Sequence, residues 1–244
     1  MSDIYVPPQE PLPPPPPPPT PPPAPAAAFD FIRPFSFVFE DPRWLPKILI
    51  GGLFILLSIL LIGWFFIAGY AARLVRNVIA GVERPLPEWD DLGGYFTEGL
   101  MLFCVLLIYA LPLVAVALMV GIPAAMMNAA ASDDMRNISG GVLGCAWCFI
   151  VPLGLAVSFF APAGLLMAVT KRRFGAAFEF GHIWQFIRDN IGNYLLAFVV
   201  YIVARFFAGF GIILLCVGVV FTEFWALMVN AYAYAQVYRL SEHK

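Results

Sequence analysis

Charged side chains are scarce in this sequence of 244 residues. Asp, Glu, Lys and Arg make up 12% of it and apolar residues 61%, whereas soluble domains carry about 25% charged and about 50% apolar residues. A soluble fold of this length could not bury so much apolar surface, so we expect lipid to be the main solvent of the chain. The formal net charge of −2 provides no strongly basic surface, and we predict no nucleic-acid partner.

Histidine and cysteine are also rare, with two and four residues respectively. The cysteines lie in apolar runs, which argues against the disulfide framework of a small secreted protein; they are Cys104, Cys145, Cys148 and Cys216. The Cys145-x-x-Cys148 spacing is that of half a metal or redox site, but no second pair accompanies it and both histidines are distant in the sequence. We interpret Cys145 and Cys148 as small interfacial residues, and predict no metal and no cofactor.

Recognisable catalytic patterns are missing as well. The polar loop after the first apolar run contains Glu88, Asp90 and Asp91, residue types that can act as general acids or bases. No Ser/His/Asp arrangement, HExxH, P-loop or GxGxxG accompanies them. A helix cap by Asp90 or Asp91 and a headgroup contact by Trp89 explain the loop better. Enzyme is therefore the least favoured class.

A proline-rich arm forms residues 1–27, with seven consecutive prolines from Pro13 to Pro19. Proline fixes φ and donates no hydrogen bond, so this arm should be an extended polyproline II helix. It is either a semi-rigid spacer, which we favour, or a ligand for a polyproline-binding domain. We expect the membrane domain over residues 28–240 and a short polar tail at 241–244.

Four long apolar stretches follow the arm, at residues 48–69, 99–127, 140–169 and 194–237. A helix needs about 20 apolar residues to cross a bilayer, so each of the first three fits one pass. The last is too long for one pass, and we predict a hairpin with its turn near Leu214. The predicted fold class is all-α: a polytopic transmembrane helix bundle of about five spans, or of four spans plus a re-entrant hairpin.

Two shorter segments have the pattern of amphipathic helices that lie on a membrane surface. In residues 177–189, apolar side chains recur at helical spacing on one face: Phe180, Ile183, Trp184 and Ile187. Residues 29–40 are rich in phenylalanine but too short and too polar to span. Because tryptophan favours the headgroup region, we predict three interfacial anchors, namely Trp44, Trp89 and Trp184.

The chain also contains an internal echo. Residues 28–31 read Ala-Phe-Asp-Phe and residues 177–180 read Ala-Phe-Glu-Phe, and the ungapped match continues with Phe37 against Phe186. Each block runs into an apolar stretch. Internal repeats are common in membrane bundles, whereas short aromatic strings also match by chance. A repeat is the reading we favour.

The distribution of Lys and Arg predicts the orientation, because these residues concentrate on the cytoplasmic side. The loops after the first and third stretches and the C-terminus are basic, whereas the loop between the second and third carries only Arg136. The segment before the first stretch is basic too, although one pass through residues 48–69 cannot leave both ends inside. We favour a cytoplasmic arm and a re-entrant hairpin; the length of the stretch favours a single pass.

Arg205 and Glu223 are the only charges deep inside an apolar stretch. Charges within a membrane are costly and mark function by default. These two lie on opposite arms of the predicted terminal hairpin and could pair at matching depth. As a pair they either lock the two helices together, which we favour, or form a relay or substrate site.

Three strings resemble a known family. They are Phe39-Glu-Asp-Pro-Arg-Trp-Leu45, then Gly69-Tyr70 leading to Arg73, Arg76 and Asn77, and Pro85-Leu-Pro-Glu-Trp-Asp-Asp91. Together they are similar to the bacterial and archaeal membrane family called domain of unknown function 4013, over about residues 35–240. The last string is the most specific. The resemblance implies a multi-pass membrane protein and brings no activity, cofactor or site.

We therefore expect a non-enzymatic scaffold or accessory subunit of the cell membrane. Its partners would be the lipid bilayer, other membrane proteins or a polyproline-binding domain. The alternative is a small transporter or channel component that uses Arg205 and Glu223. That alternative requires polar residues along a cavity, which the sequence supplies poorly.

Overall fold

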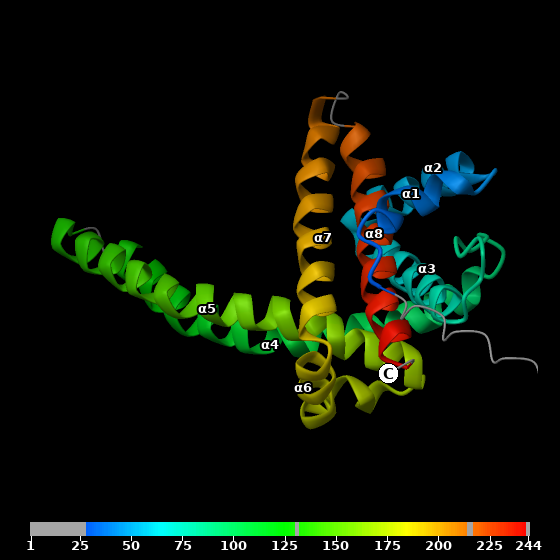
Figure 1. The fold of residues 1–244 in the computed structure, drawn as a ribbon. Helices are drawn as coiled ribbons and strands as arrows, with labels where there is room; N and C mark the ends of the chain where they lie inside the picture. Colours follow the sequence, from blue (N-terminus) through cyan, green and yellow to red (C-terminus); the bar gives the residue numbers. More distant parts are fainter. Residues whose placement is uncertain (1–27, 130–131, 214–216, 243–244) are drawn as a thin grey trace, which may run out of the picture.

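The computed structural model of the chain describes residues 28–129, 132–213 and 217–242, and all the regular structure in them is helical (Figure 1). The predicted all-α class is confirmed. The arm at residues 1–27, Leu214 and Cys216 lie outside the described residues. In chain order the helices are α1 (Arg33–Ser36), η1 (Phe37–Glu40), α2 (Trp44–Leu57), η2 (Ser58–Leu60), α3 (Ile62–Ile79), α4 (Leu92–Ala129), α5 (Asp133–Lys171), η3 (Phe174–Phe178), α6 (Phe180–Asp189), α7 (Ile191–Gly209), η4 (Phe210–Ile213) and α8 (Val217–Ser241).

The first apolar stretch folds back on itself between α2 and α3. Leu61 takes a left-handed conformation (φ 64°) and separates η2 from α3. Phe54 and Phe66 then stack with ring centroids 4.7 Å apart, although they would be about 18 Å apart along one continuous helix. The stretch is thus a helical hairpin in this structure rather than one straight helix.

Helices α4 and α5 form a second, much longer hairpin that projects away from the other helices (Figure 1). They contain 38 and 39 residues, with two prolines inside each. We call the part beyond the core, residues 113–129 and 132–155, the distal hairpin, because none of its residues belongs to the hydrophobic core cluster. Within it, Ser139 Oγ donates to the Ala124 carbonyl at 3.0 Å.

Three helical segments are long and apolar enough to cross a membrane: α4, residues 137–171 of α5, and residues 191–212. A fourth candidate is Arg33–Glu40 together with Trp44–Leu60, although the chain bends by 110° between them. Three or four candidate spans are thus present in the described part of the chain, and the count of five stays a prediction.

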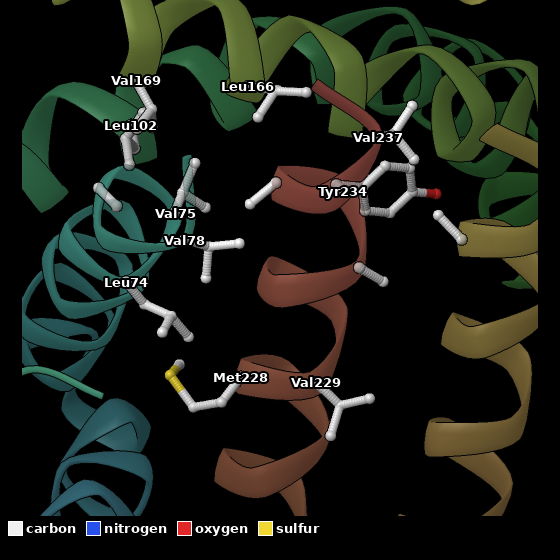
Figure 2. Close-up of a cluster of buried hydrophobic side chains, with 14 of the residues drawn as sticks. Leu74, Val75, Val78, Leu102, Leu166, Val169, Met228, Val229, Tyr234 and Val237 are labelled. Atoms are coloured by element: carbon white, nitrogen blue, oxygen red, sulfur yellow. The ribbon is translucent and has the colours of Figure 1, made fainter. Parts of the chain in front are cut away.

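The core is built around α3 and α8, which pack on each other and on α2, α4 and α7. Leu74, Val78 and Met228 fill the contact between them (Figure 2). Helix α4 crosses α3 closely, since a Cβ on Gly99 would overlap the Phe65 carbonyl. Glycine is therefore required there for backbone contact.

The two segments expected at the membrane surface both turn apolar residues toward the protein. In η1, Phe37 is buried and stacks on Tyr232 of α8 with centroids 4.5 Å apart. In α6, Ile183 and Ile187 are buried, whereas Trp184 stays 53% exposed. Both short helices precede a hairpin, α2/α3 or α7/α8, as the internal echo suggested.

Candidate functional site

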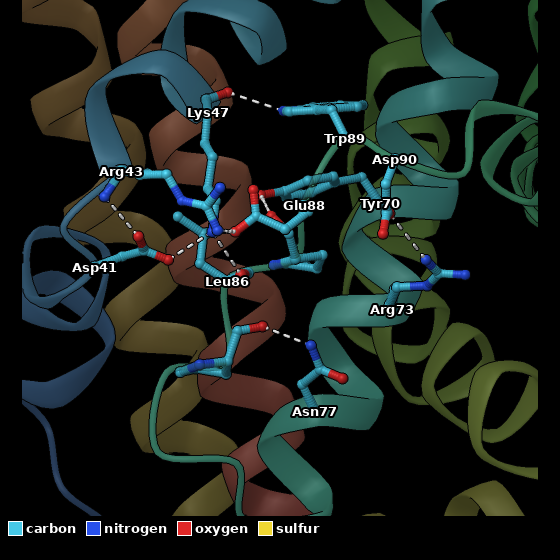
Figure 3. A network of polar contacts seen from close by, with 12 residues as sticks. Asp41, Arg43, Lys47, Tyr70, Arg73, Asn77, Leu86, Glu88, Trp89 and Asp90 are labelled. Atoms are coloured by element: carbon cyan, nitrogen blue, oxygen red, sulfur yellow. Dashed lines mark hydrogen bonds and ion pairs between the residues drawn. The ribbon is translucent and has the colours of Figure 1, made fainter.

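The most concentrated group of polar contacts lies where the loop between α3 and α4 meets α2 (Figure 3). At its centre is Lys47 of α2, which is only 3% exposed. Lys47 Nζ contacts Asp41 Oδ2 at 2.6 Å, Glu88 Oε1 at 2.7 Å and the Leu86 carbonyl oxygen at 3.1 Å. An ammonium group has three protons, so Lys47 is fully satisfied.

The carboxylates around Lys47 are held by further donors. The Arg43 backbone N–H donates to Asp41 Oδ1 at 2.7 Å, and Arg43 Nη2 donates to Glu88 Oε1 at 2.8 Å. Burial on its own would raise the pKa of Asp41, but the hydrogen bonds from Lys47 and Arg43 and their positive charges lower it below the usual value. The ionised form of Asp41 is therefore the stable one, which suits an ion pair rather than proton transfer.

The loop itself is fixed through its carbonyl groups. Tyr70 Oη donates to the Pro87 carbonyl at 2.7 Å, and Asn77 Nδ2 donates to the Pro85 carbonyl at 2.8 Å. Tyr95 Oη also donates to the Glu88 carbonyl. Tyr70 and Asn77 belong to α3 and Tyr95 to α4, so side chains of both helices satisfy the carbonyl groups of the loop. The Pro-Leu-Pro-Glu string is thus a strap tied to α2, α3 and α4.

Trp89 is placed inside this assembly. Its ring stacks on Tyr70 and on Phe54 with centroids 4.2 and 4.9 Å apart, and its Nε1 donates to the Lys47 carbonyl at 3.1 Å. Of the other expected anchors, Trp44 is partly buried like Trp89, whereas Trp184 is exposed. Trp44 packs edge-on against Phe39, and Trp184 is the most exposed of the three.

The remaining loop carboxylates connect α3 to the start of α4. Asp91 Oδ1 accepts from the Gly94 backbone N–H at 2.9 Å, so Asp91 is the predicted helix cap. Its Oδ2 pairs with Arg73 at 2.7 Å. One turn further, Arg76 and Glu98 form a bidentate ion pair.

Arg205 and Glu223 come together on the α7/α8 hairpin, where Arg205 Nη1 donates to Glu223 Oε2. Their side chains are 50% and 30% exposed, so the pair lies on the outer surface of the bundle. Arg205 is four residues before the end of α7, and Thr222 Oγ1 donates to the Ala208 carbonyl at 2.9 Å nearby. These contacts tie the two helices together near the end of the hairpin.

Metal ligation has little support among the described residues. No group of three or more His, Cys, Asp or Glu side chains converges there. Cys145 and Cys148 are both exposed on α5, and Cys148 Sγ contacts the Gly144 carbonyl oxygen at 3.9 Å.

The ion pairs and hydrogen bonds around Lys47 hold α2, α3 and the strap together, but their geometry suggests no reaction. Its charges and loop carbonyls contact one another. Reasoning from the sequence singled out the strap but missed Lys47 as its centre. The signal was available: Lys47 is a cation at the start of an apolar stretch, six residues after Asp41.

Comparisons with known proteins give one result. No curated protein and no solved structure matches the sequence. A family model described as "Protein of unknown function (DUF4013)" matches residues 52–217. That range includes the whole strap and all of α4, α5 and α7, and it is about two thirds of the chain. The chain therefore belongs to the DUF4013 family, as the sequence motifs had indicated.

Proposed function

We propose that this protein is a non-enzymatic scaffold or accessory subunit of the cell membrane, which binds other membrane proteins through its distal hairpin. The observation that carries the proposal is the exposure of this apolar surface. Met119 is 74% exposed and Phe149 71%. Only 11% of the most apolar segment of α4 and 6% of that of α5 are buried, against 28% in α7.

The length of the distal hairpin supports a role beyond anchoring. The 38 residues of α4 span about 57 Å at 1.5 Å per residue, whereas the hydrocarbon core of a bilayer is about 30 Å thick. A helix needed only to cross would be shorter. The backbone of the distal hairpin is also accessible at its glycines, since no other part of the protein lies within 4 Å of where a Cβ would stand on Gly121, Gly140 or Gly144. Small residues favour close helix packing in membranes.

We propose that the candidate spans α4, α5 and α7 cross the membrane, that α8 crosses with them because it packs along α7, and that α2/α3 is a re-entrant hairpin. With α4/α5, which extends sideways from α7/α8 in Figure 1, turned parallel to them in the bilayer, all three hairpins would begin and end on one side, and the basic N-terminal segment would lie on that side as well. The chain contains fourteen Lys and Arg residues. Only Arg136 and Arg205 are close in sequence to the turn of a hairpin, and the other twelve are nearer the ends of the hairpins. The basic ends, with the proline-rich arm, would be cytoplasmic.

Accessibility labelling tests this orientation. Single cysteines at Ser2, Ser241 and Ser132, in a background without native cysteines, are exposed to a membrane-impermeant maleimide in intact cells. We expect labelling at position 132 only. Labelling at position 2 but not at 241 would mean that residues 48–69 cross once and that the arm is outside.

The remaining surface features extend the proposal. We place α6 and α1/η1 at the cytoplasmic interface, with Trp184 in the headgroup region. An isolated peptide of residues 177–189 should become helical on anionic vesicles. The double substitution Trp184→Ser with Ile187→Ser should abolish this gain in helicity. The arm would act as a spacer or as a ligand for a polyproline-binding domain.

Site-specific photo-crosslinking tests the scaffold role itself. A photoreactive residue replaces Trp147 or Phe149 in the distal hairpin, which are 62% and 71% exposed, and Ile202 of α7, which is 52% exposed, serves as the control. We expect discrete protein adducts in native membranes from the hairpin positions and lipid adducts from position 202. Lipid adducts at all three positions would contradict the proposal.

A further inference from the structure

An aromatic groove of about 470 Å³ runs between α4, α5 and the segment that contains η3 and α6. Five of its nine lining residues are aromatic and the other four are apolar; the aromatic ones are Tyr109, Phe160, Phe178, Phe180 and Trp184. Their rings pack on one another, since Tyr109 stacks on Phe178 with centroids 5.8 Å apart and Phe160 lies 6.0 Å from Trp184. The groove thus presents several ring faces in fixed positions.

Trp184 offers this groove a hydrogen-bond donor as well as a ring. It is 53% exposed, and no described residue accepts a hydrogen bond from its Nε1. Tyr109, in contrast, already donates through its Oη to the Ala177 carbonyl at 2.6 Å. A ligand that matches both features has apolar faces for the rings and an acceptor for Trp184.

A polyproline II helix has these properties. Proline has an apolar ring and no N–H, so the helix presents rings and unpaired carbonyl acceptors. Aromatic-lined grooves of recognition domains bind such helices, whose preformed conformation reduces the entropy lost on binding. The acyl chain of a lipid would fill the groove but would leave the Trp184 donor without an acceptor. The chain carries a polyproline segment of its own, the run Pro13–Pro19 within the arm.

The arm ends near the part of the protein that holds this groove. With its amide oriented to satisfy both groups, Gln236 of α8 bonds the backbone N–H and carbonyl of Asp30 at 2.7 and 3.1 Å. Two residues further along α8, Tyr238 packs on Phe186 of α6 with centroids 6.0 Å apart. Figure 1 shows α6 close to this end of α8. The start of the described chain and α6 therefore adjoin the same end of one helix.

The length of the arm is sufficient to reach the groove. Pro19 is nine residues before Ala28, which corresponds to about 28 Å of polyproline II helix at about 3.1 Å per residue. A helix with its side chains is about 10–12 Å wide. The proline run can therefore pass around the end of α8 and across α6.

Charge also favours the arm as the occupant. Residues 1–27 contain two acidic residues, Asp3 and Glu10, and no Lys, Arg or His. Residues 171–189, which form the η3 and α6 side of the groove, contain four Lys and Arg residues against two carboxylates. This side of the groove therefore keeps an excess of positive charge, and Glu10 is only three residues before the proline run.

We propose that the aromatic groove binds the proline-rich arm of the same chain, with prolines of the Pro13–Pro19 run against its rings and one of their carbonyl groups accepting from Trp184 Nε1. This assigns the ligand role of the arm to a site within the protein. It rests on the orientation proposed above, which places the arm and α6 on one side of the membrane. While the arm occupies the groove, it is not available to a polyproline-binding domain of another protein.

Electron paramagnetic resonance tests the docked arm in the full chain in nanodiscs. Spin labels are attached at Thr20→Cys, directly after the proline run, and at Gly181→Cys, where no neighbour lies within 4 Å of a new Cβ. The background lacks native cysteines and each disc holds one protein. We expect a short, narrow distance distribution that becomes long and broad when Pro13–Pro19 is replaced by Ser-Gly repeats of equal length. Distributions that are alike in the two chains would overturn the proposal.

Substitutions of Trp184 separate its ring from its donor. A fluorescent peptide of residues 9–23 is titrated into the chain with the Ser-Gly arm, whose groove is open to the peptide. Trp184→Phe keeps a ring but removes the donor, and we expect roughly five- to tenfold weaker binding, as the loss of one net hydrogen bond allows. Trp184→Ala should abolish binding, whereas Trp147→Ala, the same change at an exposed tryptophan of the distal hairpin, should leave it unchanged. Equal affinity with and without Trp184→Ala would contradict the proposal.

The titration also separates this proposal from the proposed orientation, because the added peptide reaches a nanodisc from either side. If the arm and the groove lay on opposite sides, the peptide would bind while the spin labels stayed far apart, and docking within one chain would be wrong. If neither experiment detects binding, the groove has another occupant. Adducts on Phe160 or Phe180 from a phospholipid with a photoreactive acyl chain would then identify this occupant as lipid.

Discussion

The strap region and the distal hairpin hold their helices in place by different means. Around Lys47, side chains from α2, the loop and α3 meet in ion pairs and hydrogen bonds across about 40 residues of sequence. In the distal hairpin, α4 and α5 pack on each other, and none of its described residues belongs to the hydrophobic core cluster. The comparison shows that many of the scarce charged residues fix the positions of α2, α3 and the strap relative to one another. The two longest helices, α4 and α5, instead keep an accessible apolar surface.

Loss of Lys47 should have the largest effect on stability. Lys47→Met leaves the Asp41 carboxylate buried without its cation, and breaking a buried pair from one side costs about 3–5 kcal/mol. The thermal midpoint in detergent measures this. Asp41→Leu added to Lys47→Met should recover part of the loss, because no unpaired buried charge then remains.

Arg43→Met is the matched control, since Arg43 also contacts Glu88 but is exposed. Exposed pairs contribute about 0–1 kcal/mol. If Arg43→Met is as unstable as Lys47→Met, burial does not determine how much each ion pair contributes to stability. The proposed difference between buried and exposed pairs of the strap is then wrong.

Glycine substitutions compare the two regions directly. Gly99→Ala should separate α4 from α3, because the new Cβ overlaps the Phe65 carbonyl, and we expect a cost of about 3 kcal/mol. Gly144→Ala in the distal hairpin meets no neighbour and should stabilise the helix by about 0.5–1 kcal/mol. If Gly144→Ala also destabilises the purified protein, the distal hairpin has contacts beyond those of α4 with α5.

The Arg205–Glu223 pair should behave between these extremes. It joins two helices, as the strap does, but it is on the outer surface. A double-mutant cycle with Arg205→Leu and Glu223→Leu should give a coupling on the order of 1 kcal/mol. A coupling near zero would separate the two side chains in the membrane and leave Glu223 as the better candidate for a functional carboxylate.

The smallest effect is expected from Glu179 at the start of α6. Hydrogen bonds from Lys171 and His182, with the charges of Lys171 and Arg173, lower the pKa of Glu179 to about 2. Because the pKa of Glu179 is lowered in the folded protein, its ionised carboxylate contributes to folding stability. This contribution is complete above the usual pKa near 4.5 and is lost as the pH falls toward 2. Wild type should therefore lose slightly more thermal stability than Glu179→Gln between pH 5 and pH 2. If the thermal midpoints of the two proteins fall in parallel between pH 5 and pH 2, this prediction is wrong.

Several elements could be predicted because their signals are local. The terminal hairpin follows from a stretch too long for one pass, the cap by Asp91 from its place before a helix, and the family from contiguous strings. In the Lys47 cluster the partners are up to 41 residues apart and meet only after α2 and α3 fold back. A pattern along the chain cannot report that meeting.

Glycine in the first apolar stretch has a role that a pattern along the chain does not reveal. The chain reverses at Leu61 and not at Gly51, Gly52 or Gly63. The glycines admit neighbours instead: a Cβ at Gly51 or Gly52 would overlap Phe224 or Phe221 of α8, and one at Gly63 the Phe54 carbonyl. Trp89 stacks on Tyr70, a contact that its place in a polar loop does not reveal, and its role as an interfacial anchor stays a prediction.

The position of Lys47 also has a consequence for the order in which the protein is made. Asp41 precedes Lys47, but Leu86 and Glu88 emerge from the ribosome 39 and 41 residues later. At about 5–20 residues per second, Lys47 waits roughly 2–8 s with a single partner. During that interval a lysine in an apolar helix opposes insertion. The α2/α3 hairpin should therefore enter the membrane late, once the strap has been synthesised, and substitution of the strap should trap nascent chains in which α2 is still outside the lipid.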